Sequence, residues 1–386
     1  MAVLSRISYS FVVLYILASS PFHFSKFFLD LILCLPPWTR PSREWTLMQA
    51  VRMRVVRLVL FYWSLSKLGN RLSLRDGAEG NRFEVMPPRF TKAYQGPLAQ
   101  DPVIEPRPLG ATWTPARPPP EKLSRAGMVV ALHFHGGAYV IGDGRDSDTG
   151  YLAKTFLRHT GCTHVCTPQY RLSSGDRGYF PAPLQDAVTA YLHLTRTQRI
   201  PASQIILSGD SAGANLALAL LRYIQEHGAE LDMALPAAVG LWSPWVDVSG
   251  ALRQDMSKSA NYGTDYLNKG FGRWGATTVS NFGKVDVGGP YLSPLHHPFA
   301  LDPSIPVFVN AGEREVLRDD IRAFCDRYRE EAGWSIHLEE SRGCPHDIIL
   351  LGSRAGFAKE AEAAARAAGS FYAQRTALPL RCRQGV

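Results

Sequence analysis

The sequence predicts an α/β protein with a mostly parallel central sheet flanked by helices. From residue 128 onward, short apolar runs of strand length alternate with helix-forming segments, the pattern of a parallel sheet covered on both faces. One apolar run, residues 204–207, leads through Gly209-Asp210-Ser211-Ala212-Gly213 directly into a helix-forming run. With 46% hydrophobic and 20% charged residues in a chain of 386, the composition is that of a globular protein. A ligand site of such a fold is expected beyond the carboxyl ends of the strands.

Residues 1–75 form an apolar and basic segment that we expect to be a membrane anchor or a cap. Residues 7–18 and 27–35 are apolar runs separated by Ser19-Ser20-Pro21, and neither run alone reaches the ~20 residues that span a bilayer. Three interpretations remain open: a signal peptide in residues 1–20, a membrane anchor or re-entrant hairpin, and an apolar cap packed on the rest of the chain. The second run opposes simple secretion, because cleavage after the first would leave it exposed.

A basic amphipathic helix is expected over residues 45–63, where Arg52, Arg54 and Arg57 stand among apolar residues. Such a helix suits a membrane surface, and it equally suits the cover of a ligand site. Arginines that follow the apolar runs favour a cytoplasmic location for the main domain, although Arg6 at the amino terminus opposes this. A soluble cytoplasmic protein, or one in the secretory pathway, is the alternative.

Residues 76–127 are rich in proline and predict extended chain that enters the main domain, residues 128–386. In that domain we expect strands at residues 128–134, 162–169, 204–207, 237–242, 305–310 and 334–339, and helices at 184–198, 214–221, 318–332 and 357–372. Residues 249–297 interrupt this alternation with a Gly- and aromatic-rich stretch. We expect this insertion to close over the site together with the N-terminal segment.

Ser211 is the predicted nucleophile. After the strand that ends near Leu207, the chain must reverse within a few residues before the next helix begins. Gly209 and Gly213 remove side chains where strand and helix pass closest, which leaves the Ser211 hydroxyl at the apex of a sharp turn. The motif occurs by chance in roughly one chain in ten of this length. Its setting between a strand and a helix therefore carries the prediction.

His346 is the predicted general base, which a serine hydroxyl needs in order to act as a nucleophile near neutral pH. In this architecture the acid and then the histidine follow the serine along the chain. Only His337 and His346 follow residues 305–310. His337 alternates with apolar residues inside a strand, whereas His346 stands in a loop after Gly343-Cys344-Pro345.

Glu315 is the predicted acid and Glu313 the runner-up. Both stand in the loop after the strand at residues 305–310, while Asp319 and Asp320 fit the first turn of the following helix. In the alternative interpretation, all four carboxylates are solvated loop charges.

The oxyanion donors are expected from the backbone amides of Gly136, Gly137 and Ala212. His135-Gly136-Gly137 directly follows an apolar strand, and Ala212 follows the nucleophile. Glycines let backbone amides approach a substrate without a Cβ in the way.

These motifs, in this order, resemble the hormone-sensitive-lipase branch of the α/β-hydrolases over about residues 125–372. The matching stretches are His135-Gly136-Gly137, Tyr170-Arg171-Leu172, residues 180–187, Gly209-Asp210-Ser211-Ala212-Gly213, Glu315-Val316-Leu317 and His346-Asp347. The resemblance implies the α/β-hydrolase fold, a helical cap from the N-terminus and an insertion, and a serine mechanism without metal or organic cofactor. By position, Ser211, Glu315 and His346 resemble the triad, Gly136, Gly137 and Ala212 the oxyanion hole, and His135 and Asp210 supporting motif residues.

Three positions depart from the pattern of that branch. Asp is common where Glu315 stands, a third Gly is common at Ala138, and Ala-Pro-Glu commonly follows where this chain has Ser173-Ser174-Gly175. These departures concern the cap and the pocket more than the triad. The apolar N-terminus followed by a basic helix also resembles fungal carboxylesterases of the branch, some of which serve secondary metabolism.

We therefore expect a serine carboxylesterase or deacetylase acting on a moderately large apolar small-molecule ester. A non-hydrolytic cyclisation, condensation or acyl transfer by the same triad, and a catalytically silent ligand-binding homologue, are the alternatives. Nucleic-acid binding is excluded, because the net charge of +8 is not gathered into a basic run. The six cysteines contain no Cys-x-x-Cys pair and predict neither a zinc site nor a disulfide framework. The sequence does not predict an oligomeric state.

Overall fold

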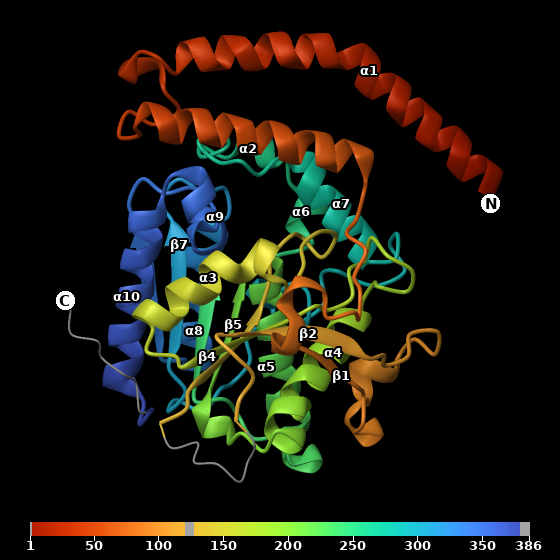
Figure 1. The fold of residues 1–386 in the computed structure, drawn as a ribbon, viewed down its shortest axis with the longest axis vertical. Helices are drawn as coiled ribbons and strands as arrows, with labels where there is room; N and C mark the ends of the chain where they lie inside the picture. The colour runs from red at the N-terminus through yellow and green to blue at the C-terminus, as the bar shows by residue number, and fades with distance from the viewer. Residues whose placement is uncertain (1, 120–126, 379–386) are drawn as a thin grey trace.

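The computed structural model describes residues 2–119 and 127–378 of the chain, with side chains from residue 13 onward. The described strands form one eight-stranded sheet in the order β1-β2-β4-β3-β5-β6-β7-β8. β3 to β8 run parallel, whereas β1 and β2 are antiparallel to their neighbours. The predicted α/β fold with a mostly parallel sheet is confirmed, and helices cover the sheet on both faces (Figure 1).

The elements alternate from β3 to the last helix much as the sequence predicts. The strands are β1 (Phe83–Met86), β2 (Leu109–Thr114), β3 (Val130–Phe134), β4 (His164–Pro168), β5 (Ile205–Asp210), β6 (Ala238–Trp242), β7 (Val307–Gly312) and β8 (Ile336–Ser341). The helices are α1 (Ala2–Leu33), α2 (Leu47–Ser66), α3 (Asp146–His159), α4 (Ala182–Leu192), α5 (Ala212–Leu231), α6 (Gly250–Arg253), α7 (Lys269–Val279), α8 (Arg318–Ala332), α9 (Ile348–Ala355) and α10 (Ala358–Arg375).

The sheet begins earlier in the chain than predicted, because β1 and β2 lie within the proline-rich residues 76–127. Pro108 and Pro115 bracket β2 without interrupting its ladder to β4. All six residues of β2 are buried, and Trp113 Nε1 donates a hydrogen bond to Glu84 Oε2 on β1 at 2.8 Å. The prolines therefore mark the ends of a buried strand, not a structureless entry to the domain.

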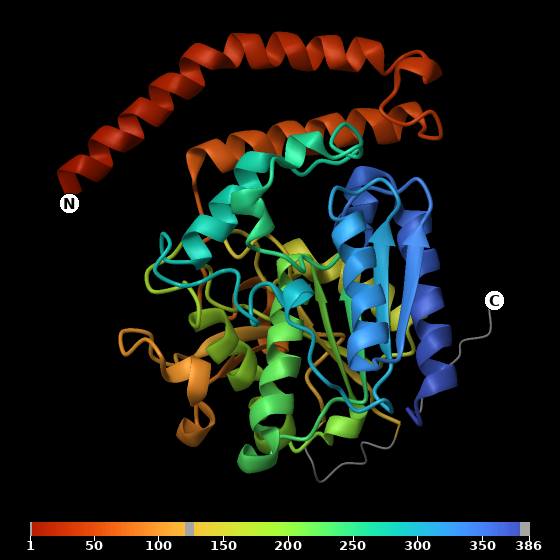
Figure 2. The same ribbon diagram turned by 180° about the vertical axis from the view of Figure 1, so that it is seen from behind.

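The two apolar runs of the N-terminal segment lie in one long helix, α1, and residues 19–21 between them do not break it. α1 continues through Pro21, and the hydroxyls of Ser19 and Ser20 donate to the carbonyls of Tyr15 and Ile16 at 2.7 and 2.5 Å. The helix is bent along its length (Figure 2), as expected of a helix that contains proline. By length and composition, Val13–Leu33 could cross a membrane or serve as a signal sequence.

α2 lies across the end of the molecule where the parallel strands terminate (Figure 1). A capping box starts the helix: Gln49 N–H donates to the Thr46 hydroxyl, and the Gln49 side chain accepts from the Thr46 amide. Trp45 Nε1 donates to Gly343 O at 2.6 Å, and Gly343 directly precedes Cys344-Pro345-His346. The guanidinium of Arg57 donates to the carbonyls of Tyr262 and Asp265 in the insertion. α2 is thus attached to both loops that approach the predicted site.

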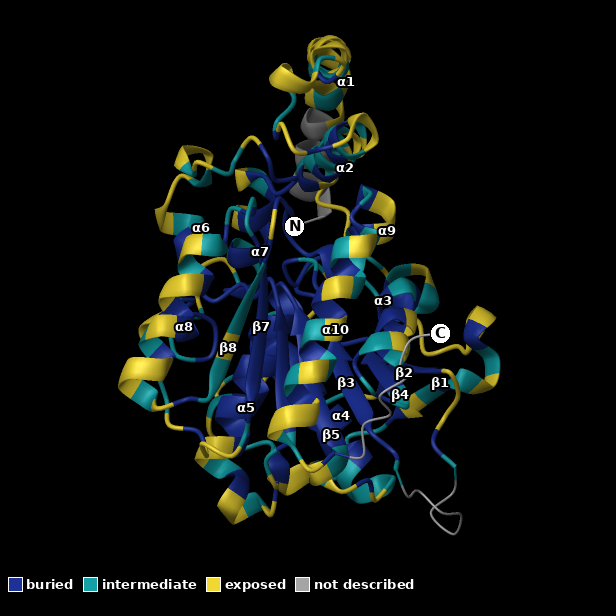
Figure 3. Cartoon of the chain, turned by 90° about the vertical axis from the view of Figure 1, so that its left-hand side faces the viewer, coloured by how far each residue is buried: buried dark blue, intermediate teal, exposed yellow. Residues whose placement is uncertain are grey.

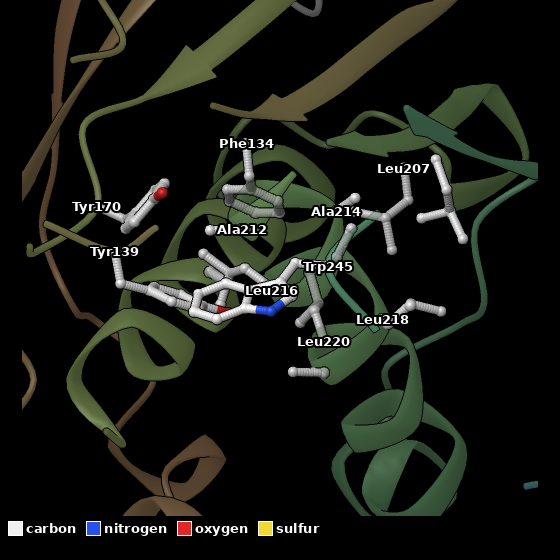
Figure 4. Close-up of a cluster of buried hydrophobic side chains, with 14 of the residues drawn as sticks. Phe134, Tyr139, Tyr170, Leu207, Ala212, Ala214, Leu216, Leu218, Leu220 and Trp245 are labelled. Atoms are coloured by element: carbon white, nitrogen blue, oxygen red, sulfur yellow. The ribbon is translucent and has the colours of Figure 1, made fainter. Parts of the chain in front are cut away.

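The hydrophobic core fills the space between the sheet and its helices, and the turn at Ser211 packs against it. Figure 4 shows Phe134, Leu207 and Leu216 among the side chains that surround the start of α5, and all three are buried. Figure 3 shows the strands buried through most of their length, while α1 carries exposed and intermediate residues.

Candidate active site

Ser211 occupies a strained turn between β5 and α5. Its φ of 51° and ψ of −117° lie in a region that a residue with a Cβ adopts only under constraint. The turn is held by hydrogen bonds from Ser211 N to Trp242 O at 2.8 Å and from Trp245 N to Ser211 O at 3.1 Å. A Cβ at Gly209 would lie 2.2 Å from Gly213 O, and one at Gly213 would lie 2.0 Å from Phe134 O. Both glycines are therefore required by contact, as the motif predicts.

The structure brings together the three residues predicted as a triad. His346 Nε2 lies 2.9 Å from Ser211 Oγ, a hydrogen-bond distance. His346 Nδ1 lies 3.7 Å from Glu315 Oε1, longer than a hydrogen bond. Glu315 and His346 are almost completely buried. Catalytic hydrogen bonds are often long in enzymes without substrate and shorten in the reacting complex.

The carboxylate of Glu315 is fixed by two donors on its other oxygen. Ser243 Oγ donates to Glu315 Oε2 at 2.5 Å, and Gly312 N donates to the same oxygen at 2.9 Å. The runner-up Glu313 points elsewhere, since its Oε2 accepts from Gly343 N at 2.8 Å. Glu313 thereby holds the loop that precedes His346, while Glu315 alone of the two faces the imidazole.

The electrostatic surroundings favour a protonated His346. Burial opposes the charged imidazolium, but the negative charges of Glu315, Asp265 and Asp347 outweigh burial and raise the pKa of His346 to about 9. An imidazole that becomes basic beside a buried carboxylate can take the serine proton and keep the resulting charge.

The insertion supplies a residue that sequence analysis missed, Asp265. Its Oδ2 accepts from Val316 N at 2.8 Å and its Oδ1 from Tyr266 N at 2.7 Å. Nearby, Asn261 Nδ2 donates to Glu315 O at 2.9 Å. Residues 261–266 therefore hold the acid loop in place as well as covering it. The disrupted pattern of residues 249–297 contains no signal for this role, because the contact joins segments about 50 residues apart.

Asp210 and Asp347, which adjoin Ser211 and His346 in the chain, form a buried acidic pair. Asp210 Oδ1 lies 2.8 Å from Nε2 of His133, and burial lowers the pKa of His133 to about 3, so this histidine is neutral. Burial raises the pKa of Asp210 to about 6, and burial together with the charge of Asp210 raises the pKa of Asp347 well above its ordinary value. Asp347 could have been found from its position directly after His346.

The predicted oxyanion loop approaches Ser211 closely. A Cβ at Gly136 would lie 2.2 Å from Asp210 Oδ2 and 3.1 Å from Ser211 Cβ. Within the described chain, the amides of Gly137 and Ala212 donate to no carbonyl or side chain. Ala138 has a φ of 52°, a left-handed conformation that glycine adopts at lower cost than alanine. This explains why glycine is common at this position in the family.

The side chain of His135 binds the backbone of this loop. Its ring stacks on Tyr170 with a centroid distance of 4.4 Å, and Nδ1 lies 2.7 Å from Gly136 O. Burial lowers the pKa of His135 to about 4, so the ring is neutral and Nδ1 carries the donating proton. Its other nitrogen, Nε2, is buried without a partner in the described part of the chain.

A cavity of about 280 Å³ opens above Ser211 and His346. Gly136, Gly137 and Ser211 line one side, and the opposite side is apolar and comes from α2 and the insertion. The apolar residues from α2 and the insertion are Val55, Val56, Val59, Leu60, Trp63, Tyr266, Leu267 and Phe271, and Ile141, Leu350 and Leu351 also line the cavity. The N-terminal helix α2 and the insertion therefore both cover the site, whereas α1 lines no part of this cavity.

The cysteines do not take part in the site. Cys34, Cys162, Cys166, Cys325 and Cys344 are buried free thiols, and Cys382 lies outside the described residues. In residues 2–119 and 127–378, no cluster of three His, Cys, Asp or Glu side chains could hold a metal ion.

Comparison with known proteins identifies relatives of this architecture. The family model for the α/β hydrolase fold matches residues 131–350. An acetyl-hydrolase of Streptomyces hygroscopicus is 32% identical over 212 residues, which are 54% of this chain and 64% of that protein. An esterase of Acinetobacter venetianus is 26% identical over 268 residues, which are 68% of this chain and 80% of that protein. The match thus spans less than two thirds of the Streptomyces protein.

A solved structure extends the similarity to most of the chain. The crystal structure of an esterase from the bacterial hormone-sensitive lipase family is 25% identical, with a TM-score of 0.57, and the match covers 92% of this chain and 98% of that one. The family model covers more than half of the chain, and it includes β3, the turn at Ser211 and the loop of His346. The protein therefore belongs to the α/β-hydrolase-fold family, as a serine hydrolase of its hormone-sensitive-lipase-like branch.

Proposed function

We propose that the protein is a carboxylesterase or deacetylase that hydrolyses an ester of an apolar alcohol through an acyl-enzyme. The observation that carries the proposal is the 2.9 Å contact between His346 Nε2 and Ser211 Oγ at a strained turn beneath an apolar cavity. Strain of this kind is maintained where it positions a reacting group. The names of the relatives, acetyl-hydrolase and esterase, support the same chemistry.

In the proposed mechanism, His346 removes the proton of Ser211 as Oγ attacks the ester carbonyl. The amides of Gly136, Gly137 and Ala212 stabilise the oxyanion, and losing one such donor typically costs ~3 kcal/mol of transition-state stabilisation. Protonated His346 then delivers the proton to the leaving alcohol, and water repeats the sequence on the acyl-enzyme. Glu315 holds the imidazole and stabilises its charged form throughout.

The cavity favours a small acyl group joined to an apolar alcohol. Its volume of about 280 Å³ lies near the lower end of the ~300–1,000 Å³ of sites that enclose drug-sized ligands. A compact acyl group fits inside, while a larger alcohol extends toward α2. The acetyl-hydrolase name of one relative supports acetate as the acyl group. We propose an apolar intermediate of secondary metabolism as the physiological ester.

The test is hydrolysis of p-nitrophenyl acetate and butyrate by the wild type and by Ser211→Ala. We expect Ser211→Ala to lose measurable activity and to escape labelling by a fluorophosphonate probe that labels the wild type. Wild-type activity in Ser211→Ala would refute the mechanism, and failure of the wild type to react with the probe would indicate a silent binding homologue. With an isolated pathway intermediate, product mass separates hydrolysis, which adds one water, from cyclisation or acyl transfer.

We also propose that α1 associates with a membrane. The support is the length and apolar composition of Val13–Leu33, none of which is buried in the described chain. The full-length protein should remain with the membrane fraction after carbonate extraction. Complete release into the supernatant would refute this association.

A further inference from the structure

α1 packs its more polar side against α2 and presents its apolar side outward. Its less exposed side contains the polar residues Ser19, Ser20, His23 and Asp30 together with Ile16, Phe27 and Leu31. Tyr62 of α2 donates to Ser20 Oγ at 3.3 Å, and the His23 ring lies 4.7 Å from that of Phe61. Most of the outward residues are apolar and more than two-fifths exposed: Leu14, Leu17, Phe22, Phe24, Phe28, Leu29, Ile32 and Leu33. Ser25 and Lys26 are exposed as well. A helix on a water-soluble protein has the opposite arrangement.

α2 carries a second exposed apolar surface, which reaches the cavity. Met48, Val55, Val59 and Trp63 follow one another at intervals of seven, four and four residues and so share one side of the helix. All four are exposed, and the last three also line the cavity above Ser211. We call these four residues the α2 stripe. The stripe therefore extends from the surface to the mouth of the cavity.

The outward side of α1 and the α2 stripe are neighbouring parts of one surface. Phe24 of α1 stacks on Tyr62 of α2 with a centroid distance of 5.9 Å. Helical spacing places Leu17 and Phe28 on the same side of α1 as Phe24, and it places Val55 and Val59 on the same side of α2 as Tyr62. An apolar path thus leads from the outer side of α1 across Tyr62 to the cavity mouth.

A lipid bilayer is the occupant that this surface fits. Apolar patches of this extent rarely remain exposed to water. In Val13–Leu33 the charged side chains are Lys26 and Asp30, which pair with each other at 2.9 Å. A paired charge and an otherwise apolar outer side suit the boundary between headgroups and acyl chains.

We propose that α1 and the α2 stripe lie in the bilayer surface and that substrate enters the cavity directly from the membrane. The enzyme would then act on esters dissolved in lipid, taking them across the stripe to Ser211 without passage through water. This inference rests on the proposed esterase function and specifies the source of its substrate.

The first test compares one acyl group in two settings: p-nitrophenyl acetate in buffer, and a long-chain alkyl acetate carried in phosphatidylcholine vesicles. The variant Phe28→Glu/Met48→Glu changes two side chains that are 60% and 56% exposed and line no part of the cavity. We expect at least a tenfold loss on the vesicle-borne ester and less than a twofold change in buffer. The control Val85→Glu/Val103→Glu changes exposed residues on β1 and in the loop before β2, away from α1 and α2 (Figure 1), and should alter neither rate.

Equal rates for both double variants on the vesicle-borne ester would overturn the proposal. If hydrolysis of p-nitrophenyl acetate is absent in the wild type as well, the proposed function fails, and the second test still decides membrane contact.

The second test reads membrane contact without activity. In a Cys382→Ser background, a polarity-sensitive fluorophore is attached through Phe28→Cys, Met48→Cys or Val85→Cys, since the five described native cysteines are buried. Vesicles should shift the emission to the blue at positions 28 and 48 and leave position 85 unchanged. No shift at 28 and 48 would overturn the proposal. A shift that appears with rising protein concentration and without vesicles would overturn it in favour of a second copy of the chain on this surface.

Discussion

The two sides of the cavity are built in different ways. The lower side consists of loops at the ends of β3, β5, β6, β7 and β8, where polar groups hold one another: Ser243 Oγ donates to the buried Glu315, and the partly exposed Glu313 accepts from the loop of His346. The upper side consists of apolar side chains of α2 and the insertion, and several of them, such as Val55 and Val59, are exposed. We therefore expect the lower side to fix the chemistry through its geometry and the upper side to select the substrate through replaceable apolar contacts.

The largest predicted effect separates two histidines that follow β7. His346→Ala should reduce kcat for p-nitrophenyl acetate by about 10⁴-fold or more, because a serine without its base retains only oxyanion stabilisation and binding. His337→Ala is the matched control. His337 lies in β8, away from Ser211, and its ring stacks on the rings of Phe308 in β7 and Phe371 in α10. Steady-state kinetics of the two purified variants make the comparison. Equal losses of kcat in the two variants would mean that His346 is not the general base.

The next effect separates two glutamates in one loop. Glu315→Gln should lower kcat by about 10²- to 10⁴-fold, because an amide neither stabilises the imidazolium nor fixes its tautomer. Glu313→Gln removes the negative charge of the group that accepts from Gly343 N but keeps an accepting oxygen. It should change kcat less than about fivefold, since one surface-near contact contributes about 1 kcal/mol. Near-wild-type kcat in Glu315→Gln would show that the carboxylate 3.7 Å from His346 is not the acid.

The charges around His346 on the lower side predict that kcat/KM increases with pH. His346 must be neutral to accept the Ser211 proton, and its pKa is raised to about 9. The imidazolium therefore predominates at pH 7, and kcat/KM should rise about 100-fold from pH 7 to a plateau above 9, by one decade per unit. The profile is measured from pH 6 to 10 after subtraction of spontaneous hydrolysis. A profile that is flat above pH 7 would contradict the raised pKa.

How far the sequence could predict this lower side depends on how local each feature is. The turn at Ser211 was predictable because Gly209 and Gly213 meet within five residues. His346 and Glu315 followed from their order after β7, a rule of the fold. Asp265 and Ser243 could not be predicted, since each contacts the acid loop across a long sequence separation. β2 was missed because its flanking prolines are visible in the sequence, whereas its pairing with β4, more than 50 residues further along the chain, is not.

For the N-terminal segment, the apolar character of residues 7–35 was predictable, but the orientation of α1 relative to α2 was not. The sequence shows that residues 7–35 are largely apolar, but it does not show that Pro21 is accommodated in one helix or which side meets α2. Only the packing reveals that Ser20 and His23 face α2 while Phe24 and Phe28 lie more exposed. The choice among signal peptide, anchor and cap depends on that orientation.

The smallest predicted effect tests the upper side. Val59 lines the cavity although it is 54% exposed, so Val59→Ala should cost little folding stability. It removes two methyl groups from the contact with an apolar alcohol, and we expect KM to rise about two- to fivefold, from ~1 kcal/mol of lost burial, with kcat unchanged. Val103→Ala, at a residue 49% exposed outside the cavity, should leave both constants as they are. A change in kcat in Val59→Ala would mean that α2 positions the reacting groups, and the division between a chemical lower side and a selective upper side would then be wrong.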